Sequence, residues 1–350
     1  MDDTPRPSQE YLLSVQNLTV KYEAFRRETY ALNNVSLNIR RSEIVAIVGE
    51  SGSGKSTLGL SILKLLPSPG AEYVSGNIMF EDQNLVPLAE TEMTLLRGTK
   101  IAMIFQEPTG SLDPVYRVGD QMLEAIQIRE SRRQTDSPLG ENPKEKQSET
   151  SSSKSDVRRR EIIDSLRTVQ IPDPELVLQK YPHELSGGMA QRVIIAQALI
   201  EKPALLIADE PTSSLDVTTQ AQVLNLMKEL RTEIHTSIIL ITHDLAVAAQ
   251  LADRIVVMYA GEICEDASAS EIFESTLHPY TEGLIRSYPD HYKEDDELES
   301  IRGDTPDMKN PPPGCRFHPR CKYAFDRCRV EHPNLLEVKN DHRVSCFLRQ

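Results

Sequence analysis

Residues 44–57 read IVAIVGESGSGKST, and this stretch decides the fold. Its first five residues form an unbroken apolar run, which is typical of a strand buried on both faces. Residues 49–57 fit the pattern G-x-x-x-x-G-K-[ST] of a phosphate-binding loop (Walker A), and an apolar helical pattern, LGLSILKLL, follows directly. A chance turn rich in Gly and Ser would not have a buried strand before it and a helix after it.

The residue types of this loop suit a polyphosphate ligand. Glycines let the backbone curl so that successive N–H groups point inward, and the next helix adds its positive dipole end. Lys55 supplies a charge for the β- and γ-phosphates, and the Ser56 hydroxyl can ligate Mg²⁺. The expected nucleotide contacts are Gly49, Glu50, Ser51, Gly52, Ser53, Gly54, Lys55, Ser56 and Thr57. The loop alone also fits a kinase or a GTPase.

Further buried runs at 101–105, 205–208 and 238–241 alternate with helical patterns, which predicts an α/β layer with a largely parallel sheet. The run LLIADEP at 205–211 ends in two carboxylates, Asp209 and Glu210. At a strand tip, Asp209 can hold Mg²⁺ through its water shell and Glu210 can polarise an attacking water. A plain turn after the strand is the alternative, and the neighbouring phosphate loop disfavours it.

A second phosphate-binding element is predicted at LSGGMAQR, residues 185–192. Ser186 is a good helix N-cap, and Gly187 and Gly188 expose backbone N–H groups at a helix start. One nucleotide needs only one phosphate loop. A second element therefore suggests a site completed by another subunit.

Composition excludes several classes for this chain of 350 residues, whose length allows about two domains. The net charge is −14, which argues against nucleic acid as a partner, and 5% aromatic content without Trp argues against a stacking platform. The acidic start has no apolar signal segment, and no apolar window is long enough to span a membrane.

Two polar stretches interrupt the pattern. Residues 130–156 hold a single aliphatic residue, Leu139, so we expect a disordered insertion there. The acidic residues 290–300 and the NPPPG at 310–314 predict a linker and a stiff turn before a cysteine-bearing tail.

Four of the five cysteines lie in this tail. They are Cys315, Cys321, Cys328 and Cys346. Their gaps are wider than those of zinc knuckles, and wider gaps suit ligands at the corners of a larger cluster, so the spacing favours a [4Fe–4S] cluster. A Zn²⁺ ion and unliganded thiols are the alternatives. The tail is locally basic, which should lower thiol pKa values. We expect Cys264 to be a buried apolar residue, and His318, His332 and His342 to lie at the surface rather than on a metal.

Together these motifs resemble the ATPase subunit of ATP-binding cassette (ABC) proteins, over residues 11–268. The signature LSGGQ appears here with Met189 in fifth place, Gln106 ends the run IAMIFQ like a Q-loop, and SSLD at 213–216 resembles a D-loop. His243 after IILIT resembles the switch histidine. Tyr22, which ends LTVKY, resembles the adenine-stacking aromatic, with Tyr30 as the competing choice.

The resemblance implies an α/β P-loop NTPase fold, the ABC ATPase domain, at 1–268, with a RecA-like core sheet, an N-terminal antiparallel β subdomain and a helical subdomain at about 85–189. Residues 269–350 form a small cysteine-containing extension. Two such domains pair head to tail, with each ATP between one phosphate loop and the other chain's signature helix. The implied catalytic residues are Glu210, His243 and Gln106. The nucleotide contacts add Tyr22, Gln106, Asp209, Ser186, Gly187, Gly188 and Asp216, and the Mg²⁺ ligands are Ser56, Gln106 and Asp209.

Three segments resemble the dipeptide/oligopeptide/nickel importer branch of this family: 106–121, 278–289 (HPYTEGLIRSYP) and 311–321 (PPPGCRFHPRC). Some members of that branch have four such cysteines around a [4Fe–4S] cluster. The branch implies an ATPase at the cytoplasmic face of the membrane. Its partners would be a paralogous ATPase subunit in a heterodimer, two transmembrane permease subunits and, indirectly, an extracytoplasmic solute-binding protein. A soluble ABC ATPase acting on ribosomes or DNA is the alternative function.

Overall fold

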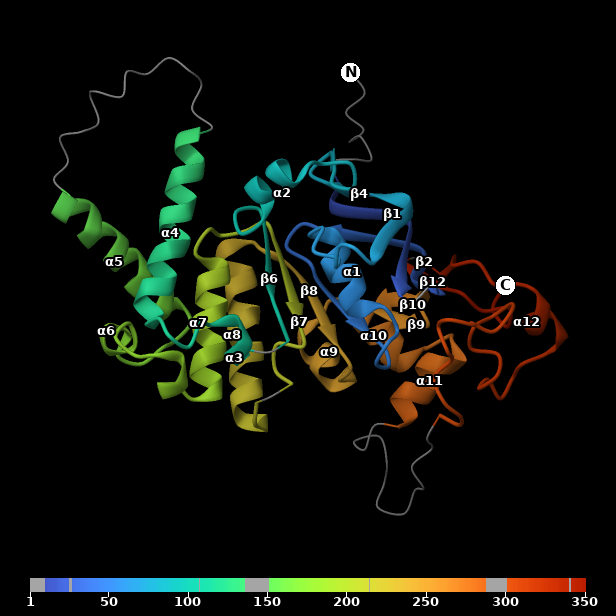
Figure 1. Ribbon diagram of the computed structural model, residues 1–350. Helices are drawn as coiled ribbons and strands as arrows, with labels where there is room; N and C mark the ends of the chain where they lie inside the picture. Colours follow the sequence, from blue (N-terminus) through green and yellow to red (C-terminus); the bar gives the residue numbers. More distant parts are fainter. Residues whose placement is uncertain are drawn as a thin grey trace, which may run out of the picture. The chain divides into compact units, whose positions relative to one another are not determined.

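A computed structural model describes residues 10–24, 27–106, 108–135, 151–213, 215–287, 301–339 and 341–350 (Figure 1). The chain divides into two compact units, and unit 1 is built from two separate stretches of sequence. Unit 1 combines Met1–Met93 with Ser237–Gln350, and unit 2 is Thr94–Thr236. Residues 269–350 therefore share a unit with the phosphate loop. The predicted domain boundary at 268/269 stays a prediction.

Unit 1 contains the antiparallel sheet expected near the N-terminus. Its strands, in the order β2-β1-β4-β5, are β1 (Tyr11–Ala24), β2 (Arg27–Arg40), β4 (Ala71–Phe80) and β5 (Gln83–Asn84). Alternate apolar side chains such as Leu13, Val15, Leu37 and Ile39 are buried on one face. The β1–β2 and β1–β4 pairs are antiparallel, which confirms the N-terminal antiparallel β subdomain.

A second set of strands in unit 1 carries the phosphate loop. Its order is β11-β12-β10-β9-β3-β8. The strands are β3 (Ile44–Val48), β8 (Ser237–Thr242), β9 (Arg254–Tyr259), β10 (Glu262–Ser268), β11 (Leu336–Lys339) and β12 (His342–Val344). β3 is parallel to both β8 and β9, and every residue of β3 and β8 is buried. β10 and β12 pair antiparallel, so the tail adds strands to the sheet of the nucleotide body.

The helices of unit 1 that the structure describes are short. They are α1 (Lys55–Ile62), α9 (Leu245–Leu251), α10 (Ala269–Glu274), α11 (Pro279–Arg286) and α12 (Asp326–Val330). α9 packs on β3 and β8, and α10 packs on β9 and β10. α2 (Glu90–Leu96) runs across the sequence boundary between the units.

Unit 2 has two parallel strands and most of the long helices. β6 (Ile101–Ile104) pairs in parallel with β7 (Leu205–Asp209). The helices are α3 (Pro108–Ser111), α4 (Val118–Thr135), α5 (Ser151–Thr168), α6 (Pro174–Val177), the 3₁₀ turn Pro182–Glu184, α7 (Gly187–Leu199) and α8 (Val217–Ile234). The bounds expected for a helical subdomain, about 85–189, stay a prediction.

The expectation of disorder over 130–156 is wrong at both ends of that stretch. α4 continues to Thr135 and α5 begins at Ser151, while residues 136–150 lie outside the described residues. Figure 1 places α4 and α5 side by side, and ion pairs join them. Arg129 Nη2 donates to Glu161 Oε2 at 2.8 Å, and Arg158 Nε donates to Glu130 Oε1 at 3.1 Å. The two helices pair through charged side chains, and apolar content did not predict this pairing.

Among the helices that the structure describes, none is both long and apolar enough to cross a membrane.

Candidate nucleotide-binding site

The backbone of the phosphate loop lies against its neighbours at two glycines. Gly49 follows β3 with φ 152°, and Gly54 precedes α1 with φ 101°. A Cβ on Gly49 would lie 2.1 Å from the carbonyl oxygen of Met258, and one on Gly54 would lie 2.6 Å from that of Ala31. Because these clashes involve backbone atoms, only glycine fits at either position.

The amino group of Lys55 points into this loop. Lys55 Nζ donates to the carbonyl oxygens of Gly49 at 2.7 Å and Glu50 at 2.9 Å, and the side chain is buried. Ser53 is also buried, whereas Ser56 is exposed on the first turn of α1. The loop therefore has the inward cation and the exposed hydroxyl that a magnesium-bound polyphosphate requires.

Of the two candidate aromatic residues, Tyr22 lies beside the phosphate loop. Its hydroxyl is 3.4 Å from Oγ1 of Thr57, the last residue of the loop motif. Tyr30 lies on β2 opposite Lys21 and is 37% exposed. This geometry favours Tyr22 for the adenine contact.

His243 lies at the same sheet edge as the loop. Val48 and Thr242 are paired in the parallel β3–β8 ladder, so Gly49 and His243 each follow a paired residue. His243 is exposed. The carboxyl ends of parallel strands are where open α/β sheets bind ligands.

Unit 2 brings together Gln106 and Glu210, two residues that the sequence assigned to hydrolysis. β6 and β7 are parallel and pair Ile104 with Ala208, so the residues after them meet at one edge. Gln106 Nε2 donates to Glu210 Oε2 at 2.8 Å. Glu210 has φ 46°, a conformation rare for a residue with a side chain, and Asp209 beside it is buried. The arrangement holds one carboxylate in a fixed direction at the end of β7.

The signature segment forms an open helix start. Ser186 caps α7, because its Oγ accepts the N–H of Met189 at 3.3 Å. Ser186 and Gly187 are exposed. A Cβ on Gly188 would lie 2.4 Å from Cγ2 of Thr219, so this glycine permits close packing of α7 on α8. The exposed amides leave the positive end of α7 accessible to an anion.

Asp216 caps the next helix. Its carboxylate accepts the Thr219 hydroxyl at 2.7 Å and the Thr219 N–H at 3.0 Å, and these hydrogen bonds lower the pKa of Asp216. Ser213 Oγ donates to the carbonyl oxygen of Glu210 at 3.2 Å, and Ser214 lies outside the described residues. The segment 213–216 thus links the carboxylate at the end of β7 to the start of α8.

Unit 1 accordingly contains Tyr22, the phosphate loop and His243, and unit 2 contains the carboxylates, Gln106, the signature helix and Asp216. Sequence reasoning did not predict that the backbone N–H of Glu50 donates to Oη of Tyr280, at 2.9 Å. Tyr280 is fully buried in α11. Tyr280 lies in the segment HPYT at 278–281, which entered the sequence analysis only for its resemblance to the importer branch.

The four tail cysteines line one cavity of about 20 Å³ in unit 1, together with His278 and Phe317. Burial raises the pKa of the Cys315 thiol to about 12 and also raises the pKa values of Cys321 and Cys346. The expectation that basic neighbours lower these pKa values is therefore wrong. Desolvation outweighs the charge of the tail.

No group of three or more His, Cys, Asp or Glu side chains in the described ranges is arranged to hold a metal ion.

Cys264 is buried as predicted, and burial raises its pKa. The surface position expected for His342 is wrong, because His342 is fully buried with Nε2 2.8 Å from Glu265 Oε1. Pairing with a buried carboxylate lets this polar ring enter the core. His332 is 46% exposed, as expected.

Comparison with known proteins identifies the family. The ABC transporter family model matches residues 32–213. The chain belongs to the ABC transporter family. Residues 264–328 also match the oligopeptide/dipeptide transporter, C-terminal region. Members of the ABC family hydrolyse ATP, so the chain is an ATPase, and the kinase and GTPase interpretations are wrong.

Similar curated proteins span the whole chain. The oligopeptide transport ATP-binding protein AppD of Bacillus subtilis is 44% identical over 337 residues, covering 96% of each chain. The dipeptide transport ATP-binding protein DppD of Escherichia coli is 41% identical over 335 residues, again covering 96% of each. Among solved structures, the ATP-binding cassette MJ0796 bound to ADP and Pi is 29% identical with a TM-score of 0.59, covering 73% of this chain and 98% of that one.

Proposed function

We propose that this chain is the ATP-hydrolysing subunit that energises a dipeptide or oligopeptide ABC importer. One observation carries the proposal: similarity to peptide-transport ATP-binding proteins extends through the tail, where residues 264–328 match the C-terminal region of oligopeptide/dipeptide transporters. A cassette of another branch would match the nucleotide body alone. The ribosome- or DNA-acting alternative has no support among these relatives, and the net charge of −14 disfavours it.

Hydrolysis requires an oriented water and compensation of charge on the γ-phosphate. In the proposed mechanism Glu210 polarises the water, and its hydrogen bond from Gln106 fixes the carboxylate. Lys55 and His243 offset the charge that develops on the phosphate oxygens. Ser56, Gln106 and Asp209 would hold Mg²⁺, which neutralises phosphate charge when bound. The water oxygen bonds to the γ-phosphorus while the bond from that phosphorus to the β–γ bridging oxygen breaks. ADP leaves with the bridging oxygen, and the water's oxygen stays on the inorganic phosphate.

The exposed start of α7 supports an ATP-driven dimer. Its open amides suit the phosphates of a nucleotide bound on a second ATPase subunit, and the partner's helix would in turn serve this chain's phosphate loop. Asp216, beside the carboxylate segment, would lie near that contact. We propose a paralogous ATPase subunit as the partner, at the cytoplasmic face of two membrane permeases supplied by an extracytoplasmic solute-binding protein. ATP would close the pair, and hydrolysis would reopen it.

The test is transport by the complete complex in lipid vesicles. Wild-type complex should hydrolyse ATP faster when loaded with its binding protein and a peptide, and should accumulate that peptide. Glu210→Gln should lower turnover by about 100-fold or more while ATP still binds. Glu229→Gln, a change on the exposed face of α8, is the matched control and should hydrolyse normally.

Two outcomes of this test would count against the proposal. Turnover retained by the Glu210→Gln complex would remove that residue from its role. A wild-type complex that hydrolyses ATP but neither responds to peptides nor transports them would contradict the peptide assignment.

We also propose that the tail cysteines hold a [4Fe–4S] cluster. Support comes from the cavity, which all four residues line. Because burial favours the protonated thiols, cluster binding must release protons. Four thiolates suffice for such a cluster, which would staple a tail with little apolar core.

Metal analysis of anaerobically purified protein tests this assignment. We expect brown protein with about four iron atoms and matching acid-labile sulfide per chain. Cys328→Ser should lose both, and Cys264→Ser should keep both, because Cys264 does not line the cavity. Colourless protein with one zinc ion, or with no metal, would overturn the proposal.

A further inference from the structure

The phosphate loop contains one acidic residue, Glu50, in a segment proposed to bind the anionic ATP. A carboxylate this close to a polyphosphate is unfavourable unless its charge is compensated. Glu50 lines a cavity of about 90 Å³ with Ser51, Gly52 and Ser53. The tail residues Thr305, Pro306 and Met308 line the same cavity, so the tail lies against the loop.

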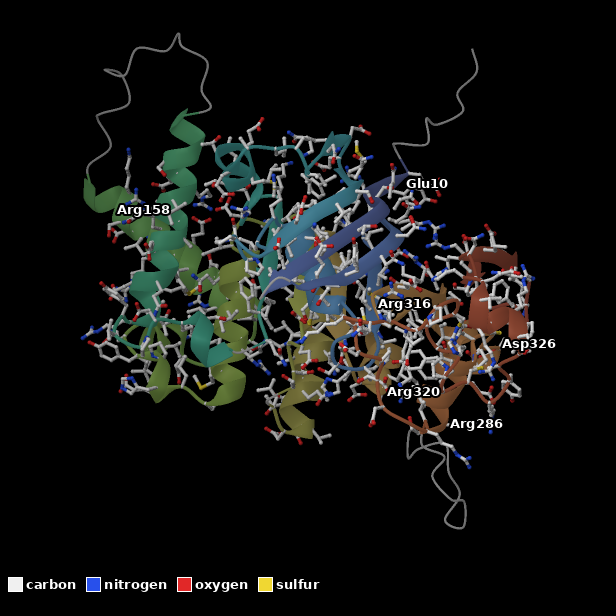
Figure 2. The ribbon with its side chains drawn as sticks, turned by 45° about the vertical axis from the view of Figure 1, so that its right-hand side comes forward. Glu10, Arg158, Arg286, Arg316, Arg320 and Asp326 are labelled. Atoms are coloured by element: carbon white, nitrogen blue, oxygen red, sulfur yellow. The ribbon has the colours of Figure 1, made fainter. Side chains whose placement is uncertain are left out.

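The compensation comes from the tail. Arg320 Nη1 lies 2.7 Å from Glu50 Oε2, and Nη2 lies 3.0 Å from Oε1, which is a two-pronged pair. The Arg320 side chain is only 7% exposed and that of Glu50 is 26% exposed, so water screens the pair incompletely. In Figure 2 Arg320 lies in the inner part of the C-terminal segment, whereas Asp326 lies at its outer edge.

Arg320 is itself held in place. Its Nε donates to the carbonyl oxygen of Arg302 at 3.1 Å, and its guanidinium lies 5.8 Å from the ring centre of Tyr259. Its backbone N–H donates to the carbonyl oxygen of Phe317 at 3.0 Å, inside the turn that begins at Cys315. The guanidinium is thus presented to the loop by a fixed turn.

Glu50 connects this turn to the groups that receive the phosphates. Its backbone N–H donates to Oη of Tyr280 and its carbonyl oxygen accepts Lys55 Nζ, while its carboxylate pairs with Arg320. A change at the carboxylate therefore acts on a residue that also orients the lysine. The carboxylate of Glu50 thus joins the tail to the phosphate loop by an ion pair.

We propose that Arg320 is a positioning residue for ATP binding, which neutralises Glu50 and so keeps the phosphate loop receptive to the polyphosphate. The inference rests on the proposed function, because it assumes that ATP occupies this loop. Loss of Arg320 leaves an uncompensated, partly buried carboxylate beside the phosphates. Loss of Glu50 leaves a cation there. The two changes should therefore alter ATP affinity in opposite directions, whereas a purely structural ion pair predicts the same loss for both.

The experiment measures ATP binding by calorimetry, with kcat and KM of hydrolysis, on the full-length chain in its assembled complex. Arg320→Ala should raise the dissociation constant and KM for ATP by about 10-fold with a smaller effect on kcat. Glu50→Gln should bind ATP as tightly as wild type or more tightly. The double variant Arg320→Ala/Glu50→Gln should recover most of the lost affinity, and Arg320→Lys should recover part of it.

Salt and a neighbouring cation supply the controls. Added salt should narrow the difference between Arg320→Ala and wild type, because it screens repulsion between Glu50 and ATP. Lys322→Ala removes a nearby cation of the tail. Lys322 pairs with Glu282 at 3.4 Å rather than with the loop, so this change should leave KM for ATP unchanged.

Equal losses in Arg320→Ala, Glu50→Gln and the double variant would overturn the proposal in favour of a merely structural pair. So would unchanged ATP affinity in Arg320→Ala. Absence of ATP binding in the wild type would instead refute the proposed function, so the two failures are distinguishable.

Discussion

Strand β3 and the tail, residues 301–350, belong to the same compact unit but are stabilised in different ways. All five residues of β3 are buried, and they are paired on both sides by parallel strands. In the tail, α12 has five residues, β12 has three, and every residue of β11 is exposed. Apolar burial stabilises the strand, whereas the tail combines a few buried apolar side chains, such as Phe317 and Val344, with individual polar contacts to the body.

Those polar contacts are specific pairs of side chains. Arg316 pairs with Glu262 at 2.8 Å, His342 pairs with Glu265, and Arg343 pairs with Asp266. Each joins the tail to β10, and Arg320 joins it to the phosphate loop. A region held in this way can loosen locally while the sheet stays folded. The difference predicts which substitutions affect the whole unit and which affect the tail alone.

The largest effect is expected from Ile47→Ala in β3. Truncating a fully buried side chain should cost about 3 to 4 kcal/mol of unfolding free energy, because it removes buried apolar surface and leaves a cavity. Chemical denaturation followed by circular dichroism measures the shift in midpoint. Val74→Ala, at a site 45% exposed in the same unit, should leave the midpoint nearly unchanged. Similar shifts for both would contradict the comparison.

A smaller and local effect is expected from His342→Gln in β12. The change weakens the pair with buried Glu265 and should cost about 1 to 3 kcal/mol. Hydrogen exchange should become faster in the amides of β12 and the adjacent part of β10, while the amides of β3 keep their protection. Loss of protection in β3 to the same extent would show that the tail and the body unfold together.

The smallest expected effect is a dependence of tail stability on pH through His332. The hydrogen bond to Glu262 raises the pKa of His332, although burial opposes the charge. Its charged form therefore stabilises the fold below the unfolded pKa of about 6.5, and this contribution is lost as pH rises through the higher folded value. Between about pH 6 and 8 proteolysis of the tail should accelerate in wild type. His332→Gln should lack that pH dependence, and an identical profile in both would exclude the pair as its cause.

The body could be predicted from sequence because its signals are local. The run at 44–48 is a buried strand, the loop at 49–57 begins α1, and the predicted Gln106 and Glu210 are joined by a hydrogen bond. β-branched runs report burial on both faces, and parallel strands bring their carboxyl ends to one edge. These rules predicted the phosphate loop and the carboxylates at the end of β7, whereas Tyr22, Gln106, Asp216 and His243 were assigned through the resemblance to a family.

The remaining features depend on pairs of residues far apart in the chain. Glu50 and Arg320 are separated by 270 positions, and His342 and Glu265 by 77. Composition could not show that His342 has a buried carboxylate partner, nor that Arg129 and Glu161 join two polar helices. Local patterns report the average environment of a segment, whereas a polar pair depends on where the fold brings each member.

The discontinuity of unit 1 also has a consequence for synthesis. The strand beside the phosphate loop, β8, begins at Ser237, and β12 is made only at His342–Val344. Because domains fold as their parts emerge from the ribosome, the unit that contains the loop must wait for sequence made long after the loop itself. The intervening unit 2 can form first from one continuous stretch. A nascent chain would therefore gain its nucleotide site late, when most of the protein already exists.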